Sequence, residues 1–195
     1  MSLTSSRMLD LGTRAPYFKL PDVRGQRDYS VSDFNDKKGL LVMFICRHCP
    51  YVKFIKEELG RLDRDYAGGN VALVAISSND ASTYPDDSPD SLARFAAEEG
   101  YSFPLLYDES QQTARAFGAE CTPDFFLFDQ NRELVYRGQL DDSRPGNSIP
   151  VDGRDLRAAL DALLAGTAIP ADQKASIGCN IKWKPGPAAS GSTTP

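Results

Sequence analysis

The sequence predicts an α/β protein whose mixed β-sheet carries helices on both faces. Two short apolar runs, residues 40–45 and 71–76, have the length and composition of buried strands. The segment between them repeats apolar residues at helical spacing, at Val52, Ile55, Leu59, Leu62 and Tyr66. Along the chain the predicted order is β-α-β-α-β-α-β-β-α, which implies this layered arrangement.

The chain before the first buried run is predicted to hold a leader, a hairpin and a helical turn. Residues 1–11 are expected to form a flexible leader outside the domain. Residues 15–30 have the pattern of a β-hairpin, with Gly25 near its turn. Residues 31–34 are predicted as one helical turn that leads towards the central strand.

Two further helices and one strand are predicted after the second buried run. Polar residues 77–80 leave this strand and are interpreted as a plain turn. The Ser-Pro pair at 88–89 supplies a helix N-cap and a first-turn proline, so a helix is expected up to residue 99. Residues 104–107 are then predicted as a short strand and residues 109–117 as a short helix.

The C-terminal third of the chain is predicted to add a hairpin and a last helix. Residues 125–128 and 133–137 form the hairpin across a polar turn. The helix covers residues 152–164. A length of 195 residues suits one domain, which we place at residues 12–184. Residues 185–195 are rich in Pro, Gly, Ser and Thr and are expected to be a disordered tail.

The composition is that of an ordinary globular protein, with 41% hydrophobic and 25% charged residues. A net charge of −5 gives no general electrostatic reason to bind nucleic acid or an anionic membrane. No apolar stretch approaches the length of a membrane span, and the N-terminus lacks the hydrophobic core of a signal peptide. We therefore expect a cytoplasmic protein that has neither a nucleic-acid nor a membrane partner.

Cys46 and Cys49 form the constellation that carries chemistry. They follow the first buried run directly, and Pro50 then opens the next helix. The dipole at a helix N-terminus favours a thiolate over a thiol, so Cys46 is expected to be an exposed nucleophile. Cys49 lies about one turn inside and can resolve a mixed disulfide. Four cysteines are too few for a disulfide scaffold in a cytosolic chain, so the pair predicts redox catalysis.

A zinc site and a pair of inert core cysteines are the two alternatives for this motif. A zinc site needs two more ligands, usually as a second closely spaced pair. The remaining cysteines, Cys121 and Cys179, are far apart in the sequence, and the only histidine, His48, lies inside the motif. A strand end disfavours inert core thiols. We therefore predict a site that contains no metal and no cofactor.

The segment Phe44-Ile-Cys-Arg-His-Cys-Pro-Tyr-Val52 resembles the active-site segment of thioredoxin-fold proteins. More closely, the chain resembles the bacterial thioredoxin-like proteins that are grouped with the AhpC/TSA redoxins. Segments 121–129 and 176–184 strengthen the likeness, which runs from about residue 12 to residue 184. The resemblance implies a thioredoxin-like fold with an N-terminal hairpin and, as in redoxins, an extra strand–helix step near residues 104–118.

Arg47 and His48, between the two cysteines, bear on the redox potential. Positive groups beside a thiolate lower its pKa and make the corresponding disulfide more oxidising. A histidine just before the second cysteine resembles the disulfide isomerases and the DsbA-type oxidases. The alternative for Arg47 is a solvated surface charge, and both interpretations, like a distinctly oxidising potential, are left open.

Thr122-Pro123 resembles the cis-proline loop that faces the CxxC motif in this fold. A cis bond would bring the backbone of Thr122 beside the thiols, where it could pair with an extended substrate segment. Cys121 is expected either as a buried small residue or in a disulfide with Cys49 or Cys179. Cys179 lies in a segment that must return to the domain to bury its apolar residues. Cys121 and Cys179 are thus candidate accessory thiols.

Two departures limit what the resemblance implies. Thioredoxin places a buried carboxylate on the central strand to take the proton of the resolving cysteine, but residues 40–45 contain no acid. Peroxiredoxins place a threonine three residues before the peroxidatic cysteine, and here Met43 stands in that position before Cys46. The proton acceptor is therefore not predicted, and peroxidase activity is the weaker interpretation.

We predict a thiol–disulfide oxidoreductase whose substrate is a protein or small-molecule disulfide. Cys46 attacks this disulfide and Cys49 resolves the product; a reducing partner such as thioredoxin or glutathione is implied, but its identity is left open. The first alternative is an AhpC/TSA-type thiol peroxidase in which Cys46 is oxidised to a sulfenic acid. The second is a metal-binding module like the Sco copper chaperones, which use a CxxxC pair and a distant histidine that this chain lacks.

Overall fold

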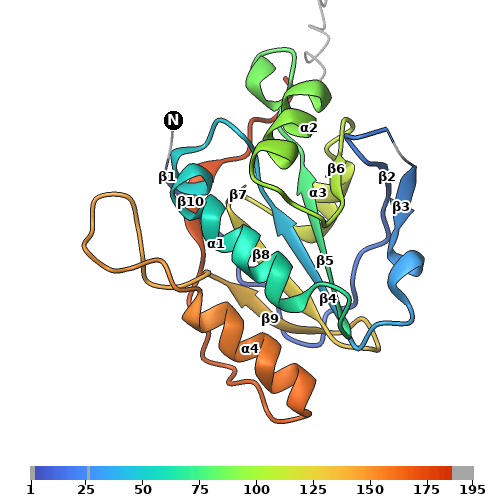
Figure 1. The fold of residues 1–195 in the computed structure, drawn as a ribbon, viewed down its shortest axis with the longest axis vertical. Helices are drawn as coiled ribbons and strands as arrows, with labels where there is room; N and C mark the ends of the chain where they lie inside the picture. Colours follow the sequence, from blue (N-terminus) through green and yellow to red (C-terminus); the bar gives the residue numbers. More distant parts are fainter. Residues whose placement is uncertain (1–2, 26, 186–195) are drawn as a thin grey trace, which may run out of the picture.

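A computed structural model of the chain describes residues 3–25 and 27–185 (Figure 1). Its centre is a five-stranded sheet in which β4, β5 and β6 run parallel and β8 and β9 run antiparallel to their neighbours. The sheet is therefore mixed, as predicted. Its strands, in spatial order, are β6 (Leu105–Tyr107), β5 (Val71–Ser77), β4 (Gly39–Phe44), β8 (Asp124–Phe128) and β9 (Leu134–Gly138).

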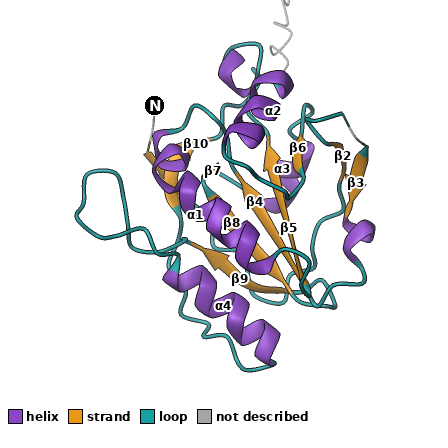
Figure 2. Ribbon diagram, in the orientation of Figure 1, coloured by secondary structure: helices purple, strands orange, loops and turns teal. Residues whose placement is uncertain are grey.

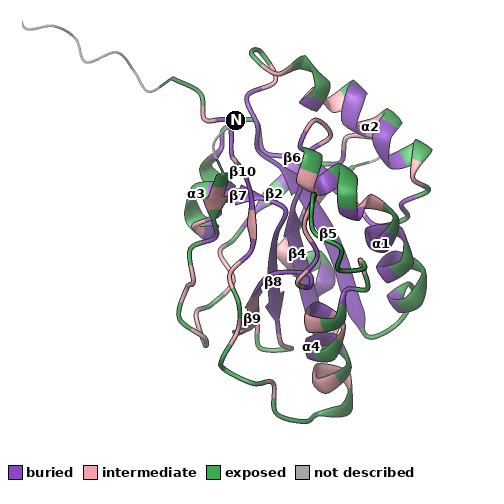
Figure 3. Ribbon diagram, turned by 90° about the vertical axis from the view of Figure 1, so that its left-hand side faces the viewer, coloured by how far each residue is buried: buried purple, intermediate pink, exposed green. Residues whose placement is uncertain are grey.

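Helices cover both faces of this sheet (Figures 2 and 3). Side chains alternate along β4, so that Leu41 and Met43 join one hydrophobic cluster while Val42 and Phe44 join another. The first cluster includes residues of α1 (Pro50–Tyr66), α2 (Pro89–Glu98) and α4 (Arg154–Ala165). The second includes Phe117 of α3 (Gln112–Phe117), which lies on the opposite side of the sheet in Figure 3. Helices on both faces are thus confirmed.

The predicted N-terminal hairpin and the extra strand–helix step are also present. β2 (Lys19–Pro21) pairs antiparallel with β3 (Asp28–Ser30), and the 3₁₀ turn η1 (Val31–Phe34) follows. Gly25 lies in the connection with a φ of +69°, a conformation that glycine adopts without steric cost. The extra step consists of β6 and α3, the second of which begins at Gln112 rather than near residue 109.

The prediction of a leader outside the domain is wrong for residues 3–5. β1 (Leu3–Ser5) pairs antiparallel with β10 (Ile177–Asn180), which pairs on its other edge with β7 (Cys121–Thr122). The reason is that a buried strand must satisfy the backbone hydrogen-bonding groups on both of its edges, and β1 supplies partners for β10. The predicted disordered tail lies, apart from residue 185, outside the described residues.

The topology fixes the place of the site. β4 is the central strand of the sheet, and its last residue, Phe44, lies in register with Ile76 of β5 and Asp124 of β8. The CxxC motif leaves this end of β4, where open parallel sheets form their ligand crevices. Among the described residues, none of the helices combines the length and apolar character that crossing a bilayer requires.

Candidate active site

The CxxC motif lies between the end of β4 and the start of α1. Cys49 is the N-cap residue of α1, and Pro50 is its first residue, as the sequence indicated. Cys46 and Cys49 are fully buried, so the expectation of an exposed Cys46 is wrong for this reduced form. Burial follows from the neighbours, because the thiols lie under the loop that contains Thr122.

The predicted cis-proline loop is confirmed and faces both thiols. The Thr122–Pro123 peptide bond is cis. Thr122 Oγ1 lies 3.4 Å from Cys46 Sγ, and Cys49 Sγ donates a hydrogen bond to the Thr122 carbonyl oxygen at 3.2 Å. One residue of the loop thus contacts both sulfurs, through its side chain and through its backbone.

The two thiols are hydrogen-bonded to each other and ionise as a pair. This hydrogen bond lowers the pKa of Cys49 to about 5, and contacts from the Cys179 thiol and the Val52 N–H add to the effect. Burial raises the pKa of Cys46 well above its ordinary value, assisted by the same hydrogen bond and by the charge of Asp87. The first proton therefore leaves the pair readily, and the second leaves only with difficulty.

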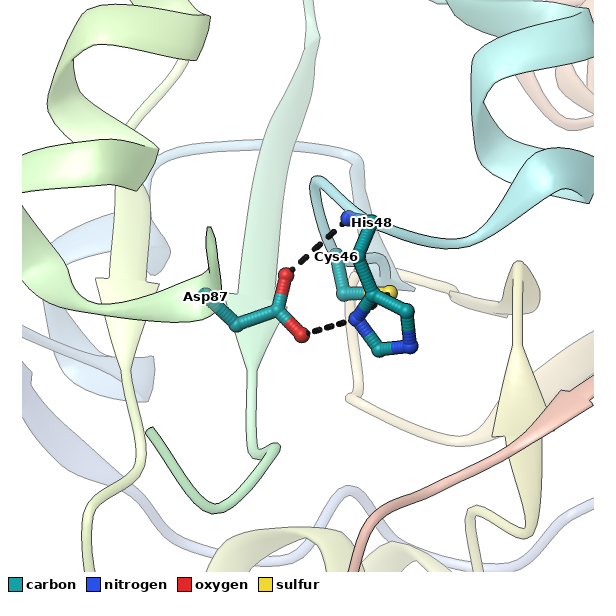
Figure 4. Close-up of side chains that lie close together, drawn as sticks. All are labelled: Cys46, His48 and Asp87. Atoms are coloured by element: carbon teal, nitrogen blue, oxygen red, sulfur yellow. Dashed lines mark hydrogen bonds and ion pairs between the residues drawn. The ribbon is translucent and has the colours of Figure 1, made fainter. Parts of the chain in front are cut away.

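Asp87, which sequence reasoning missed, anchors the loop between the cysteines (Figure 4). It lies in the 3₁₀ turn η2 (Pro85–Asp87) and is fully buried. One carboxylate oxygen accepts the backbone N–H groups of Arg47 and His48 at 2.8 and 3.1 Å. The other is hydrogen-bonded to His48 Nδ1 and accepts Asn79 Nδ2 at 2.8 Å. Burial acts to raise the pKa of Asp87, but the hydrogen bonds from His48 and Asn79 keep it below its usual value.

Residues 77–80 are not the plain polar turn that the sequence suggested. Asn79 is buried and joins three segments, since its side chain donates to Asp87 and accepts the Lys182 N–H at 2.8 Å. Their location could have predicted a role in the site, because these residues follow β5 at the end of the sheet where ligand crevices form. Asn79 thus connects the C-terminal segment to the loop that carries the cysteines.

Arg47 and His48 have different surroundings. The Arg47 guanidinium turns away from the sulfurs, donating to the Ser91 carbonyl oxygen at 2.9 Å and pairing with Glu98 at 3.1 Å. His48 stacks on Tyr84 with ring centroids 5.2 Å apart, and its Nδ1 lies 3.9 Å from Cys46 Sγ. Arg47 is therefore neither a charge beside the thiolate nor a freely solvated one, because α2 holds its head group.

The two accessory cysteines lie on either side of the β7–β10 pairing. Cys121 is a buried thiol that donates weakly to the Pro123 carbonyl oxygen at 3.8 Å, which matches the first of the two expectations for it. Burial raises its pKa. Cys179 pairs in register with Thr122, and its thiol is hydrogen-bonded to that of Cys49. Burial and this contact raise the pKa of Cys179 to about 12.

The backbone of Thr122 is not open to an extended substrate, contrary to the expectation. β10 occupies this edge, and its Gly178 lies so close that a Cβ there would be 2.0 Å from the Thr122 carbonyl oxygen. Only glycine fits at this distance. The C-terminal segment thus returns to the domain as predicted. It pairs with the backbone edge of Thr122, where an extended substrate was expected to bind.

A second buried carboxyl, Asp124, follows the cis proline. It accepts the Phe125 N–H at 3.1 Å through one oxygen, while the other has no hydrogen-bond partner among the described residues. Burial raises its pKa well above the ordinary value. The sequence comparison with thioredoxin considered a carboxyl on the central strand only. Asp124 instead lies on the neighbouring strand β8, in register with Phe44.

One group of described residues could hold a metal ion. Donor atoms of Cys46, His48 and Asp87 lie within 4.8 Å of one another. The same His48 nitrogen faces both the sulfur and the carboxylate, and it is already hydrogen-bonded to Asp87. A metal would have to replace this hydrogen bond, and the observed contacts satisfy the carboxylate without one.

The comparisons with known proteins agree with this geometry. The chain matches the model of the AhpC/TSA family over residues 11–137. It belongs to the AhpC/TSA family. A solved structure, that of an uncharacterized conserved protein from Geobacillus kaustophilus, is 52% identical; the match covers 96% of this chain and 99% of that one, with a TM-score of 0.93.

Two groups of curated relatives carry names that bear on function. The Geobacillus kaustophilus protein named "Thiol-disulfide oxidoreductase ResA" is 25% identical over 67% of this chain and 70% of its own. The Mycobacterium tuberculosis protein named "Putative peroxiredoxin Rv2521" is 27% identical over 60% of this chain and 69% of its own. A DsbE-type structure from Chlorobium tepidum, 24% identical over 80% of this chain and 99% of its own, shows the shared thioredoxin-like fold with a TM-score of 0.60.

Proposed function

We propose that this member of the AhpC/TSA family is a thiol–disulfide oxidoreductase that works through Cys46 and Cys49. The observation that carries the proposal is the pair of buried thiols at the N-terminus of α1, both of which contact Thr122 of the cis-proline loop. Such a pair can pass from two thiols to one disulfide without a cofactor. The geometry thus supports two-electron exchange with a disulfide substrate.

In the proposed reaction, Cys46 is the attacking thiol. The hydrogen bond between the two thiols lets the thiolate of Cys49 take the proton of Cys46. The Cys46 thiolate then attacks the substrate disulfide; a Cys46–substrate bond forms, and the first substrate sulfur leaves as a thiolate. Cys49 next attacks Cys46 Sγ, which forms the Cys46–Cys49 disulfide; the second substrate sulfur leaves and takes the proton of Cys49. Two electrons pass from the protein to the substrate.

The surface beside the cis proline favours a peptide-like substrate. A pocket there is lined by Tyr51, Phe54, Pro123, Arg144 and Ile177 among others. Phe54 is an exposed large hydrophobic residue, which is a feature of protein-binding surfaces. We therefore propose a protein disulfide as substrate, with thioredoxin or glutathione as the source of electrons, and a cytoplasmic location.

A thiol peroxidase is the second candidate, and one contact favours it. Thr122 Oγ1 lies 3.4 Å from Cys46 Sγ, so the loop supplies a threonine hydroxyl beside this sulfur although Met43 occupies the position where peroxiredoxins carry theirs. In this alternative, peroxide oxidises Cys46 to a sulfenic acid, and Cys49 condenses with it to a disulfide with loss of water.

Stopped-flow kinetics on the reduced protein separate the two candidates. Thiol consumption is followed with a protein disulfide and, separately, with hydrogen peroxide, in the native chain and in Thr122→Val. Fast reaction with the disulfide and slow reaction with peroxide in the native chain supports the oxidoreductase. A fast peroxide reaction that passes through a Cys46 sulfenate and is slowed in Thr122→Val overturns it in favour of the peroxidase.

A further inference from the structure

Cys179 brings a third sulfur to the redox pair. It lies directly opposite Thr122 in the β7–β10 pairing, and Thr122 accepts the hydrogen bond of Cys49 at 3.2 Å. The proximity of the two thiols also affects their ionisation, lowering the pKa of Cys49 and raising that of Cys179. Cys49 therefore lies between two sulfurs, whereas His48 and Asp87 approach the pair through Cys46.

The strand that carries Cys179 is held firmly against the site. β10 pairs with β1 on one edge and with β7 on the other. Gly178 lies so close to the Thr122 carbonyl oxygen that no side chain fits there, and Cys179 is 5% exposed. Secondary structure, rather than a loop, thus keeps the Cys179 sulfur beside Cys49.

β10 occupies the place of a bound substrate strand. Extended substrates can add to an exposed backbone edge by strand pairing, and here the edge of Thr122 is paired with the chain's own β10. A strand in this position that carries a cysteine opposite Thr122 presents a thiol to the redox pair as a substrate would. Cys179 thus occupies the position that a substrate cysteine would take.

We propose that Cys179 is a third redox-active thiol, which exchanges with the Cys46–Cys49 disulfide by attacking the sulfur of Cys49. Cys179 gives up its proton, a bond forms between the sulfurs of Cys179 and Cys49, and the Cys46–Cys49 bond breaks. The electron pair of the broken bond remains on Cys46, which takes up the proton that Cys179 released and becomes a thiol again. No electrons enter or leave the protein in this step.

The inference rests on the proposed function, because a substrate must first oxidise Cys46 and Cys49 to their disulfide. Its consequence is that the oxidised protein keeps a reactive thiol. With the disulfide moved to Cys49 and Cys179, Cys46 is available beside the cis-proline loop for a second reaction partner. A two-cysteine enzyme in its oxidised form has no such nucleophile.

Disulfide mapping tests the proposal. The full chain is oxidised with one equivalent of diamide, quenched in acid, alkylated with isotope-coded iodoacetamide and analysed by peptide mass spectrometry. We expect two disulfides, Cys46–Cys49 and Cys49–Cys179, and alkylated Cys46 in the second population. Cys179→Ser should lose that population, whereas Cys121→Ser, which changes a neighbouring buried thiol, should keep it. In Cys46→Ser, one equivalent of oxidant should give the Cys49–Cys179 disulfide.

The outcomes distinguish a failure of the exchange step at Cys179 from a failure of the proposed function. If the native chain contains only the Cys46–Cys49 disulfide, and oxidised Cys46→Ser still has an alkylated Cys179, the exchange step is refuted while the proposed function stands. If neither a Cys46–Cys49 nor a Cys49–Cys179 disulfide forms, the proposed function itself fails. Cys179→Ala, with its fold checked by circular dichroism, is measured beside Cys179→Ser so that a folding defect is not mistaken for lost exchange.

Discussion

Cys46 and Cys49 are three residues apart, yet their surroundings differ in kind. Cys46 faces a polar network in which a buried, charged Asp87 holds His48 and the loop backbone. Cys49 faces a helix N-terminus, the Thr122 carbonyl oxygen and the Cys179 sulfur. Negative charge beside Cys46 disfavours a second negative charge there, whereas the Val52 N–H and the neighbouring thiols favour a negative charge on Cys49.

This difference indicates a division of labour within the pair. The Cys49 side stores the thiolate of the reduced protein, because its pKa is lowered to about 5. Beside Cys46, Asp87 binds the backbone of the loop, and burial together with the charge of Asp87 keeps the Cys46 thiol protonated until its proton moves to Cys49. Thr122 contacts both sides, and the cis-proline loop therefore joins them. Variants of the residues on each side test this division.

Replacing each cysteine by serine should give opposite products with a peptide disulfide. Cys49→Ser should stop turnover and accumulate a stable mixed disulfide at Cys46, because no thiol remains in position to resolve it. Cys46→Ser should also stop turnover but should not accumulate that species. Intact-mass spectrometry after a brief reaction measures both, and trapping at Cys49 instead would reverse the assignment of roles.

Asp87→Asn should raise the reactivity of Cys46 and lower stability. The amide oxygen can still accept the two backbone N–H groups, but the negative charge that raises the pKa of Cys46 is gone, so alkylation at neutral pH should be faster. Loss of the charged hydrogen bond to His48 should reduce the free energy of unfolding by roughly 1–3 kcal/mol.

The exposed neighbour Asp86, in the same 3₁₀ turn, provides the matched control as Asp86→Asn. The pKa of Asp87 is lowered in the folded protein, so its stabilisation is present above about pH 4 and is lost as the pH falls through the folded value. Alkylation rates against pH and urea unfolding at several pH values measure both effects. If the alkylation profile of Asp87→Asn matches the native one, the charge of Asp87 does not control the reactivity of Cys46.

Asp124→Asn should stabilise the protein at neutral pH. Because the pKa of Asp124 is raised in the folded state, the unfolded chain releases this proton first as the pH rises. The contribution to stability is therefore fully present below about pH 4 and is lost towards the raised pKa. An asparagine has no such proton, so urea midpoints of the two proteins should agree near pH 3 and diverge in favour of the variant near pH 7. Parallel curves would contradict a raised pKa of Asp124 in the folded protein.

Arg47→Ala should have the smallest effect. Its guanidinium binds Ser91 and Glu98 on α2 rather than the sulfurs, so the alkylation rate of the reduced pair should stay close to that of the native chain. The partly exposed ion pair contributes at most about 1 kcal/mol to the free energy of unfolding. A marked fall in thiol reactivity, measured beside Glu98→Gln, would mean that the Arg47 charge reaches Cys46 after all.

Most helices and strands of the fold could be predicted from the sequence, because they follow from local sequence patterns. The apolar runs of β4 and β5, the proline at the start of α1 and the cis-proline segment each reflect nearby residues. The strands β1 and β10 were missed because short strands at the two ends of the chain depend on partners more than 100 residues away. Their existence is a property of tertiary pairing rather than of local propensity.

The candidate site, like the fold, contains features that depend on residues distant in the sequence and could not be predicted. The roles of the two cysteines are still predictions, but their position beside a cis proline was foreseen. Asp87, Asn79 and Asp124 were not, because each acts through a contact across the fold and none lies in a recognisable motif. The direction in which Arg47 points depends on α2, which the spacing within the motif does not reveal.

A redox titration of the full chain against glutathione tests whether Cys46 and Cys49 exchange two electrons as a pair. Samples equilibrated at a series of thiol-to-disulfide ratios are quenched in acid, and the state of each cysteine is read by mass spectrometry. We predict one two-electron transition in which Cys46 and Cys49 lose their thiols together and form an intramolecular disulfide, of which a part is isomerised to Cys49–Cys179. The account is contradicted if Cys49 stays reduced at every ratio while Cys46 alone is glutathionylated.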